Sequence, residues 1–119
     1  MNELKIISLN NCPYSMAAEQ LIDSIKKIDN ININLINVSD ENKNNYKNIT
    51  ISTFPQIYFN DKLIGGYDNI NEINLEIKRL KSSNVSNKLD KMIKFLNKKL
   101  KNGVFKRKEY LLLIKFFIG

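Results

Sequence analysis

Within its first 28 residues the sequence changes its hydrophobic period at a proline. Residues 4–9, Leu-Lys-Ile-Ile-Ser-Leu, form a short apolar run that predicts a β-strand. From residue 13 to about residue 28 the apolar side chains recur at helical spacing, at Leu21, Ile22, Ile25 and Ile28. Pro13 stands at about the first helical position, where its missing N–H is not needed. The chain therefore starts with a strand that passes almost directly into an amphipathic helix.

The patterns that follow extend this start into a mixed α/β sheet. The expected elements are a strand at 31–38, a short polar helix from a Ser39 cap to about 48, strands at 53–59 and 62–64 joined by an Asn60-Asp61 turn, and a helix capped by Asn69 or Asn71 that runs to about 81. The first two strands, joined by a helix, should be parallel, whereas the tight turn makes the last two antiparallel. We expect a four-stranded mixed sheet flanked by helices.

Cys12 is the only cysteine and lies at the junction between the first strand and the first helix. At that position it faces unpaired backbone N–H groups and the positive end of the helix dipole, which favour a thiolate. Free cysteine is also often a small, buried and inert core residue. The local sequence leaves both interpretations open.

Composition excludes several classes of site. One cysteine excludes an internal disulfide, and the absence of histidine excludes a zinc site built from cysteine and histidine. The N-terminus lacks the pattern of a signal peptide, and no apolar run approaches the roughly 18 residues of a membrane span. We therefore expect a reducing, cytoplasmic location.

Charge divides the chain at about Ser82-Ser83-Asn84. Residues 1–83 carry nine Lys or Arg and ten acids, a net charge of −1, whereas residues 84–119 carry ten against two, a net charge of +8. We expect one domain at 1–83 and a basic helical extension at 84–119.

The pattern of the extension predicts two helical segments. The first has a Ser86 cap, an apolar stripe and an end at Asn102-Gly103; the stripe consists of Leu89, Met92, Ile93, Leu96 and Leu100. The second, residues 110–118, is apolar but too short to span a bilayer. The extension is either a hairpin docked on the domain or on a second subunit, a segment on an anionic membrane surface, or a contact for an acidic partner. Nucleic acid is not expected, because basic and aromatic residues are not interleaved.

Three separated motifs occur in one order: Cys12-Pro13-Tyr14-Ser15, Thr53-Phe54-Pro55 and Gly65-Gly66-Tyr67-Asp68. Together they resemble the glutaredoxin family, which has the thioredoxin fold, and the resemblance covers roughly residues 3–81. It implies a glutathione-dependent thiol-disulfide oxidoreductase, with glutathione as co-substrate and glutathionylated proteins as partners.

The resemblance also implies a role for individual residues. Cys12 would be the catalytic nucleophile, and no metal site is implied. The implied glutathione-binding residues are Tyr14, Thr53, Phe54, Pro55, Gly66, Tyr67, Asp68 and Asn69. Pro55 would be a cis proline that turns the Phe54 backbone toward the cysteinyl part of glutathione, like an added strand. The start of the last domain helix would hold the γ-glutamyl carboxylate, and an acid there would meet the ammonium.

Each of these residues also has a purely structural interpretation. Tyr14 would then be a half-buried surface aromatic, Pro55 a trans proline at the start of a strand, and Asp68 a helix cap. The sole cysteine opposite them favours the binding site.

The sequence departs from the family pattern at several positions. Ser15 stands where dithiol members have a second cysteine, which leaves a monothiol route that removes glutathione from mixed disulfides. Leu9 stands where many members have a lysine, and Ile51 and Ser52 lie where an Arg or Gln is usual. These family residues bind the glycyl carboxylate of glutathione, and only Lys43 or Lys47 offers a loose replacement.

Two alternatives stay open for the function of the domain. One is a redox-inactive, glutaredoxin-like adaptor that uses its groove or its extension to hold a partner. The other is a carrier of an iron–sulfur cluster ligated by Cys12 and glutathione from two subunits. The chain has no tryptophan and lacks the Cys-Gly-Phe-Ser motif of the family's cluster-binding class.

Overall fold

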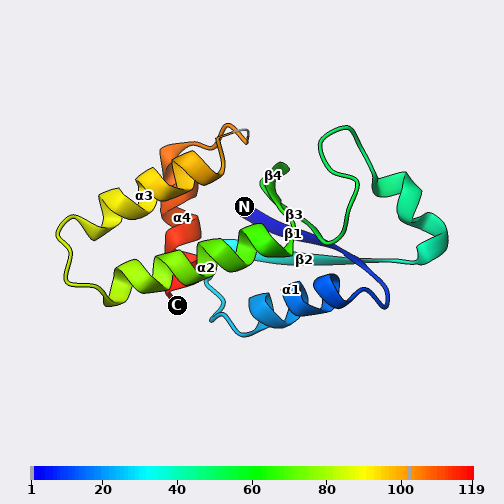
Figure 1. The fold of residues 1–119 in the computed structure, drawn as a ribbon, viewed down its shortest axis with the longest axis horizontal. Helices are drawn as coiled ribbons and strands as arrows, with labels where there is room; N and C mark the ends of the chain where they lie inside the picture. The colour runs from blue at the N-terminus through cyan, green and yellow to red at the C-terminus, as the bar shows by residue number, and fades with distance from the viewer. Residues whose placement is uncertain (1, 102) are drawn as a thin grey trace.

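The structure is a computed structural model that describes residues 2–101 and 103–119 (Figure 1). In chain order its elements are β1 (Asn2–Leu9), α1 (Pro13–Asp23), β2 (Ile31–Val38), the 3₁₀ helix η1 (Asp40–Tyr46), β3 (Gln56–Phe59), β4 (Lys62–Gly65), α2 (Tyr67–Ser82), α3 (Lys88–Lys99) and α4 (Arg107–Ile118). Helices α2, α3 and α4 gather at one end of the long axis, and η1 lies at the other end (Figure 1).

The sheet has four strands in the order β2-β1-β3-β4. Strands β1 and β2 are parallel and pair from Asn2↔Ile31 to Leu9↔Val38, whereas β1–β3 and β3–β4 are antiparallel. The Asn60-Asp61 turn between β3 and β4 has positive φ at both residues, 51° and 65°, as a two-residue hairpin requires. The predicted four-stranded mixed sheet and its thioredoxin-like fold are confirmed.

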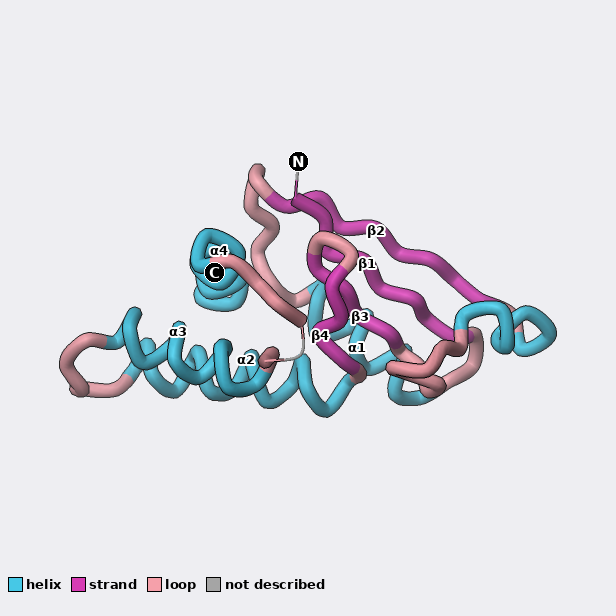
Figure 2. The backbone as a smooth tube through the Cα atoms, turned by 90° about the horizontal axis from the view of Figure 1, so that it is seen from above, coloured by secondary structure: helices cyan, strands magenta, loops and turns pink. Residues whose placement is uncertain are grey.

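The two faces of the sheet differ in what covers them. Figure 2 shows α1 and α2 on the same side of the sheet, where Leu4 and Ile6 of β1 enter the main hydrophobic core. On the opposite face Ile7 packs with Val38 and Phe54 in a smaller cluster. Because strand residues alternate between faces, successive positions of β1 supply both clusters. The second cluster fixes Phe54 against the sheet just before Pro55.

Several predicted helix boundaries were wrong. α1 ends at Asp23, not near residue 28, although Ile25 stays buried in the core beyond the helix end. The segment after Ser39 is a 3₁₀ helix that ends at Tyr46. The last domain helix begins at Tyr67 with Gly66 at its N-cap, so Asn69 and Asn71 lie inside it. β4 ends at Gly65 and Gly66 is the N-cap of α2, so the helix begins earlier than an asparagine cap at 69 or 71 would allow.

The extension also starts and ends differently from the prediction. α3 has Asn87, with φ 55°, at its N-cap in place of Ser86, and it ends at Lys99. The predicted stop included Asn102, which lies outside the described residues. Leu89, expected in the apolar stripe, is 46% exposed, whereas Met92, Leu96 and Leu100 are buried.

Both helices of the extension dock on the domain. α3 and α4 contact each other and α2, and their apolar side chains join the same core as those of the sheet. In α4 the buried apolar side chains are Tyr110, Leu113, Ile114, Phe116 and Phe117. A membrane-surface segment would have to insert these same side chains, which are here used inside the fold. None of the helices in residues 2–101 and 103–119 has the length and apolarity needed to cross a bilayer. The division of the chain at residues 83/84 stays a prediction.

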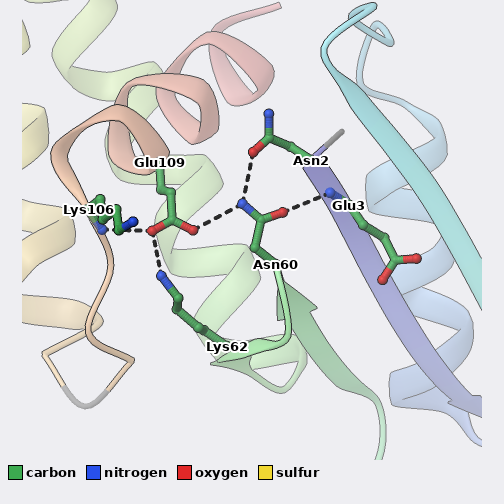
Figure 3. A network of polar contacts seen from close by, with 6 residues as sticks. All are labelled: Asn2, Glu3, Asn60, Lys62, Lys106 and Glu109. Carbon is green, nitrogen blue, oxygen red and sulfur yellow. Dashed lines mark hydrogen bonds and ion pairs between the residues drawn. The ribbon is translucent and has the colours of Figure 1, made fainter.

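A polar network fastens α4 to the sheet (Figure 3). Glu109, only 4% exposed, accepts hydrogen bonds from Lys62 at 2.6 Å, from the Asn60 amide at 3.0 Å and from the Lys106 N–H at 2.8 Å. Asn60 in turn accepts the Glu3 N–H at 2.9 Å and donates to the Asn2 side chain. One buried carboxylate therefore connects the extension to the β3–β4 turn, which is itself bonded to β1.

Candidate active site

A tight turn presents Cys12 at the end of β1. The Cys12 N–H donates to the Leu9 carbonyl at 3.2 Å, and the Asn10 N–H donates to the Val38 carbonyl at 2.9 Å. Asn11, the third residue of the turn, has φ 62°, a left-handed conformation that asparagine tolerates better than most residues. The turn places Cys12 at the N-cap of α1 with Pro13 as the first helical residue, as the sequence predicted.

The surroundings of Cys12 favour the thiolate. Partial burial raises the pKa of the Cys12 thiol, but the backbone N–H and hydroxyl of Ser15 and the backbone N–H of Tyr14 outweigh it, so the net pKa is lowered. No side-chain cap hydrogen bond forms in the structure, and the Cys12 Sγ instead lies 3.9 Å from the Phe54 carbonyl oxygen. This arrangement fits a thiol that faces a carbonyl when protonated and N–H donors when ionised.

Ser15 contributes more to this site than the sequence analysis recognised. Its side chain is fully buried, and its hydroxyl accepts the Leu9 N–H at 3.1 Å while it also lowers the pKa of Cys12. The sequence could have indicated this role. The side chain of an N-cap residue lies next to the N–H groups of the second and third helical residues, which here are Tyr14 and Ser15. The serine is therefore part of the cysteine's environment as well as a replacement for a second thiol.

A second missed contact ties β1 to α1 behind the cysteine. The Ser8 hydroxyl, 2% exposed, donates to a carboxylate oxygen of Glu19 at 2.7 Å. With the Ser15–Leu9 bond, it joins the end of the strand to two successive turns of the helix. These two bonds fix β1 against α1, the two elements that flank Cys12.

The Phe54–Pro55 segment faces Cys12 from the loop before β3. The Phe54–Pro55 peptide bond is cis, as the resemblance implied, and both side chains are buried. Phe54 packs against Ile7 and Val38, so the sheet holds the backbone that carries the carbonyl next to Cys12.

A cavity of about 240 Å³ opens beside this segment, lined by Tyr14, Thr53, Phe54, Tyr67 and Asp68. The two tyrosine rings lie 6.4 Å apart between centroids and are tilted by 44°. Tyr14 is 62% exposed. Five of the eight predicted glutathione-binding residues therefore line one cavity, although they come from three segments of the chain.

The cavity adjoins the start of α2, because Tyr67 and Asp68 are among its lining residues. Gly65 has φ +131°, and a Cβ there would lie 2.3 Å from the Asn69 side chain, so only glycine fits. A Cβ on Gly66 would lie 3.5 Å from the Pro55 carbonyl oxygen, which shows how closely the two segments approach. The first N–H to close the helix is that of Ile70, which donates to the Gly66 carbonyl at 3.2 Å. The N–H groups of residues 67–69 precede it and have no partner within the helix.

Asn69 lies differently from the other predicted binding residues. Its side-chain amide donates to the Ile64 carbonyl at 3.1 Å, and it lines a separate cavity that also contains Lys99 and Leu100. The backbone N–H of Asn69 stays at the helix start. Its side chain therefore joins α2 to the end of β4.

The suggested replacement cations do not line the cavity. Lys43 pairs with Asp40 at 2.9 Å within η1, and Lys47 caps the end of the same element. In the described part of the chain, no group of three or more His, Cys, Asp or Glu side chains is arranged to hold a metal ion.

Comparisons with known proteins identify the family of the chain. The family model described as Glutaredoxin matches residues 4–64, just over half of the chain. Among solved structures the chain is similar to Glutaredoxin 1 from Francisella tularensis, crystallised in complex with cacodylate, with 26% identity and a TM-score of 0.46 over 66% of this chain and 99% of that one. A search of curated proteins found no match. The matched region runs from β1 through β4 and includes Cys12 and Pro55, so the chain belongs to the glutaredoxin family, a family of thiol-disulfide oxidoreductases.

Proposed function

We propose that this chain is a glutathione-dependent monothiol oxidoreductase that removes glutathione from mixed disulfides through Cys12. The observation that carries the proposal is the position of Cys12. It lies at a helix N-cap with a lowered pKa, beside the Phe54 backbone, and Phe54 also lines the cavity. A thiolate is the attacking species in disulfide exchange, so a lowered pKa supports this chemistry near neutral pH.

The proposed cycle has two exchange steps. The Cys12 thiolate attacks the glutathione sulfur of a glutathionylated protein; a Cys12–glutathione disulfide forms, the original disulfide breaks, and the protein leaves as a thiolate that takes up a proton. A second glutathione thiolate then attacks the glutathione sulfur of this intermediate. Oxidised glutathione leaves and the Cys12 thiolate is restored, so the second glutathione supplies the reducing equivalent.

Within this cycle the cavity residues bind the glutathione moiety. Tyr14 and Tyr67 would enclose it, and the Phe54 backbone would pair with its cysteinyl part. The N–H groups at the start of α2 would hold the γ-glutamyl carboxylate, and Asp68 would meet the adjacent ammonium. We assign Gly66 and Pro55 to the backbone that shapes this end, and Asn69 to the same turn through its backbone N–H.

Ser15 suits the monothiol cycle. A second thiol at this position would compete for the mixed disulfide, whereas a hydroxyl cannot. Its hydrogen bonds also support the Cys12 thiolate. We further infer a reducing, cytoplasmic setting, because the reaction consumes reduced glutathione. In this proposal residues 1–83 carry the reaction and residues 84–119 form the appended basic extension.

The test is a glutathione reductase-coupled assay on a small mixed disulfide with glutathione. Wild type should turn over, and Cys12→Ser and Cys12→Ala should fall to the uncatalysed rate. Turnover by wild type no faster than by Cys12→Ala would overturn the proposal. Retained glutathione binding in that case would favour the redox-inactive adaptor. Visible absorbance of purified protein that disappears in Cys12→Ala would instead favour the iron–sulfur carrier.

A further inference from the structure

The two edges of the sheet differ in how well they are protected against pairing with a further strand. β4, at one edge, has four residues and a register shift against β3. It also includes the charged Lys62, which is bonded to Glu109 of the extension. Short length, an irregular register and a charged side chain are common means by which proteins block an edge strand. β4 has all three of them.

β2, at the opposite edge, has none of these protections. Its eight residues, Ile31–Val38, include no charged residue, no proline and no glycine. Its pairing with β1 runs from Asn2↔Ile31 to Leu9↔Val38 without a shift. Figure 2 shows β2 along the outer margin of the sheet, away from α3. A long, regular and uncharged edge strand is a template on which another strand can pair.

The hydrogen bonds at the end of the sheet show which backbone groups of β2 face outward. The Val38 carbonyl accepts the N–H of Asn10, the residue that follows β1, so Val38 directs its backbone polar groups toward β1. Successive residues of a strand direct these groups to opposite sides in turn. The N–H and C=O groups of Ile33, Leu35 and Asn37 therefore point away from β1. Within residues 2–101 and 103–119, no loop or turn backbone group bonds to them.

The outward-facing residues also expose apolar surface. Leu35 is 43% exposed, and Ile33, on the same face of the strand, is only partly buried where it packs against the main core. A strand added to this edge would cover both side chains. It would therefore gain apolar burial and cross-strand contacts in addition to backbone hydrogen bonds.

We propose that β2 pairs with β2 of a second copy of this chain, antiparallel about a two-fold axis, so that the two sheets join into one continuous sheet. A two-fold dimer brings the same surface of both copies together, and its axis reverses the direction of the strand. In an antiparallel pair, residues that face each other direct their backbone groups to the same side. Leu35 of one copy then lies opposite either Leu35 or Ile33 of the other, and both arrangements bury apolar side chains.

The charge pattern identifies the occupant of this edge as a second copy. The chain carries a net charge of +7, but β2 is uncharged, so no like charges face each other along the contact between two β2 strands. The basic residues of the extension lie on α3, on α4 and in their connection. A charged partner would find no opposite charge on β2. Because β4 is protected, association ends at two copies and does not continue from edge to edge.

The first test measures the mass of the full chain by sedimentation and light scattering over a dilution series. Reductant is present, so that no disulfide through Cys12 contributes. We expect a reversible change from twice the monomer mass to the monomer mass on dilution. A monomer at every concentration up to about 1 mM would overturn the proposal, and so would growth beyond the dimer.

Amide hydrogen exchange at high and low protein concentration locates the interface residue by residue. In the dimer, the N–H groups of Ile33, Leu35 and Asn37 should exchange at least about tenfold more slowly than in the monomer. The N–H groups of Asn34 and Ile36 face β1 and should be protected in both states. Equal exchange of residues 33, 35 and 37 in the two states would place the interface elsewhere and overturn the proposal.

Charge at Leu35 tests the self-pairing directly. Leu35→Lys brings two like charges close together across the axis and should weaken the dimer at least about tenfold. Leu75→Lys, at a 60% exposed position on α2, is the matched control and should leave dimerisation unchanged. Mixing Leu35→Lys with Leu35→Glu should restore association, which a variant that merely fails to fold would not do. A Leu35→Lys dimer as tight as wild type, or a mixture that stays monomeric, would overturn the proposal.

Discussion

The Lys62 ammonium lies 2.6 Å from a carboxylate oxygen of Glu109, at the point where the C-terminal extension meets the sheet (Figure 3). The Glu109 side chain is 5% exposed and that of Lys62 is 29% exposed. The carboxylate also accepts bonds from Asn60 and from the Lys106 N–H, so its charge is compensated by several donors. Two segments 47 positions apart in sequence are thereby held together.

Replacing this carboxylate should destabilise the fold. Glu109→Gln removes the charge that faces Lys62 and should lower the free energy of unfolding by about 1–3 kcal/mol, measured by urea denaturation. Glu72→Gln is the matched control, because Glu72 pairs with Lys99 but is 58% exposed. That change should stay within about 0.5 kcal/mol. Equal effects of the two variants would argue against a stabilising role for the buried pair.

The contribution of Glu109 should also depend on pH. Burial raises the pKa of Glu109, but the Lys106 N–H, Lys62 and Asn60 lower it by more, so the folded-state pKa lies below its ordinary value. The stabilisation is then fully present above the unfolded-state pKa of about 4.3 and is lost as the pH falls through the lower folded-state value. The stability difference between wild type and Glu109→Gln should shrink when unfolding is measured at decreasing pH below about 4.3. A stability difference that grew on acidification would contradict a lowered folded-state pKa for Glu109.

The reactivity of Cys12 should depend on Ser15. The alkylation rate of Cys12 should rise with pH around a midpoint below the ordinary thiol value of about 8.5, because its pKa is lowered. Ser15→Ala removes the hydroxyl and should move the midpoint upward. Ser24→Ala, which removes an exposed hydroxyl bonded to the Leu21 carbonyl, should leave it unchanged. A midpoint unaffected by Ser15→Ala would show that the Ser15 hydroxyl does not lower the pKa of Cys12.

The two adjacent glycines should differ in their tolerance of a side chain. Gly65→Ala places a Cβ at positive φ and against Asn69, and should destabilise the protein by about 1–3 kcal/mol. Gly66→Ala adds a Cβ in ordinary van der Waals contact with the Pro55 carbonyl at φ −97°, and should change stability by less than about 1 kcal/mol. Thermal or urea unfolding of both variants measures the two losses of stability. A larger loss for Gly66→Ala than for Gly65→Ala would contradict the prediction.

Asn74 is a site where stability can be gained. It is 5% exposed, and its Oδ1 is the one buried side-chain oxygen or nitrogen without a hydrogen-bond partner among the described residues. Asn74→Leu should raise the free energy of unfolding by about 1 kcal/mol or more, because it removes an unsatisfied polar group from the core. Asn71→Leu, on the same helix but less buried, controls for helix propensity and should gain less. No gain in Asn74→Leu beyond this control would indicate that the amide is satisfied in solution.

Much of the site could be predicted because its determinants are local. The structure confirms three features that depend on neighbouring residues. These are the strand 31–38, the Asn60-Asp61 turn, and Cys12 at a helix start followed by Pro13. The three motifs also brought the cavity residues into one expected site. Helix ends were predicted less well, since α1 stops at Asp23 while Ile25 continues to pack in the core.

The residues alone were enough to predict the order of strands and helices, the placement of the sole cysteine and the basic character of the extension. The folded chain was needed to find that Asn69 bonds to the Ile64 carbonyl, that Ser15 accepts the Leu9 N–H, and that α3 and α4 share the core of the sheet. The physical reason is the range of the interactions. Periodicity, capping and turns involve residues a few positions apart, whereas the buried pair of Lys62 and Glu109 exists only after the sheet and α4 have brought distant residues together.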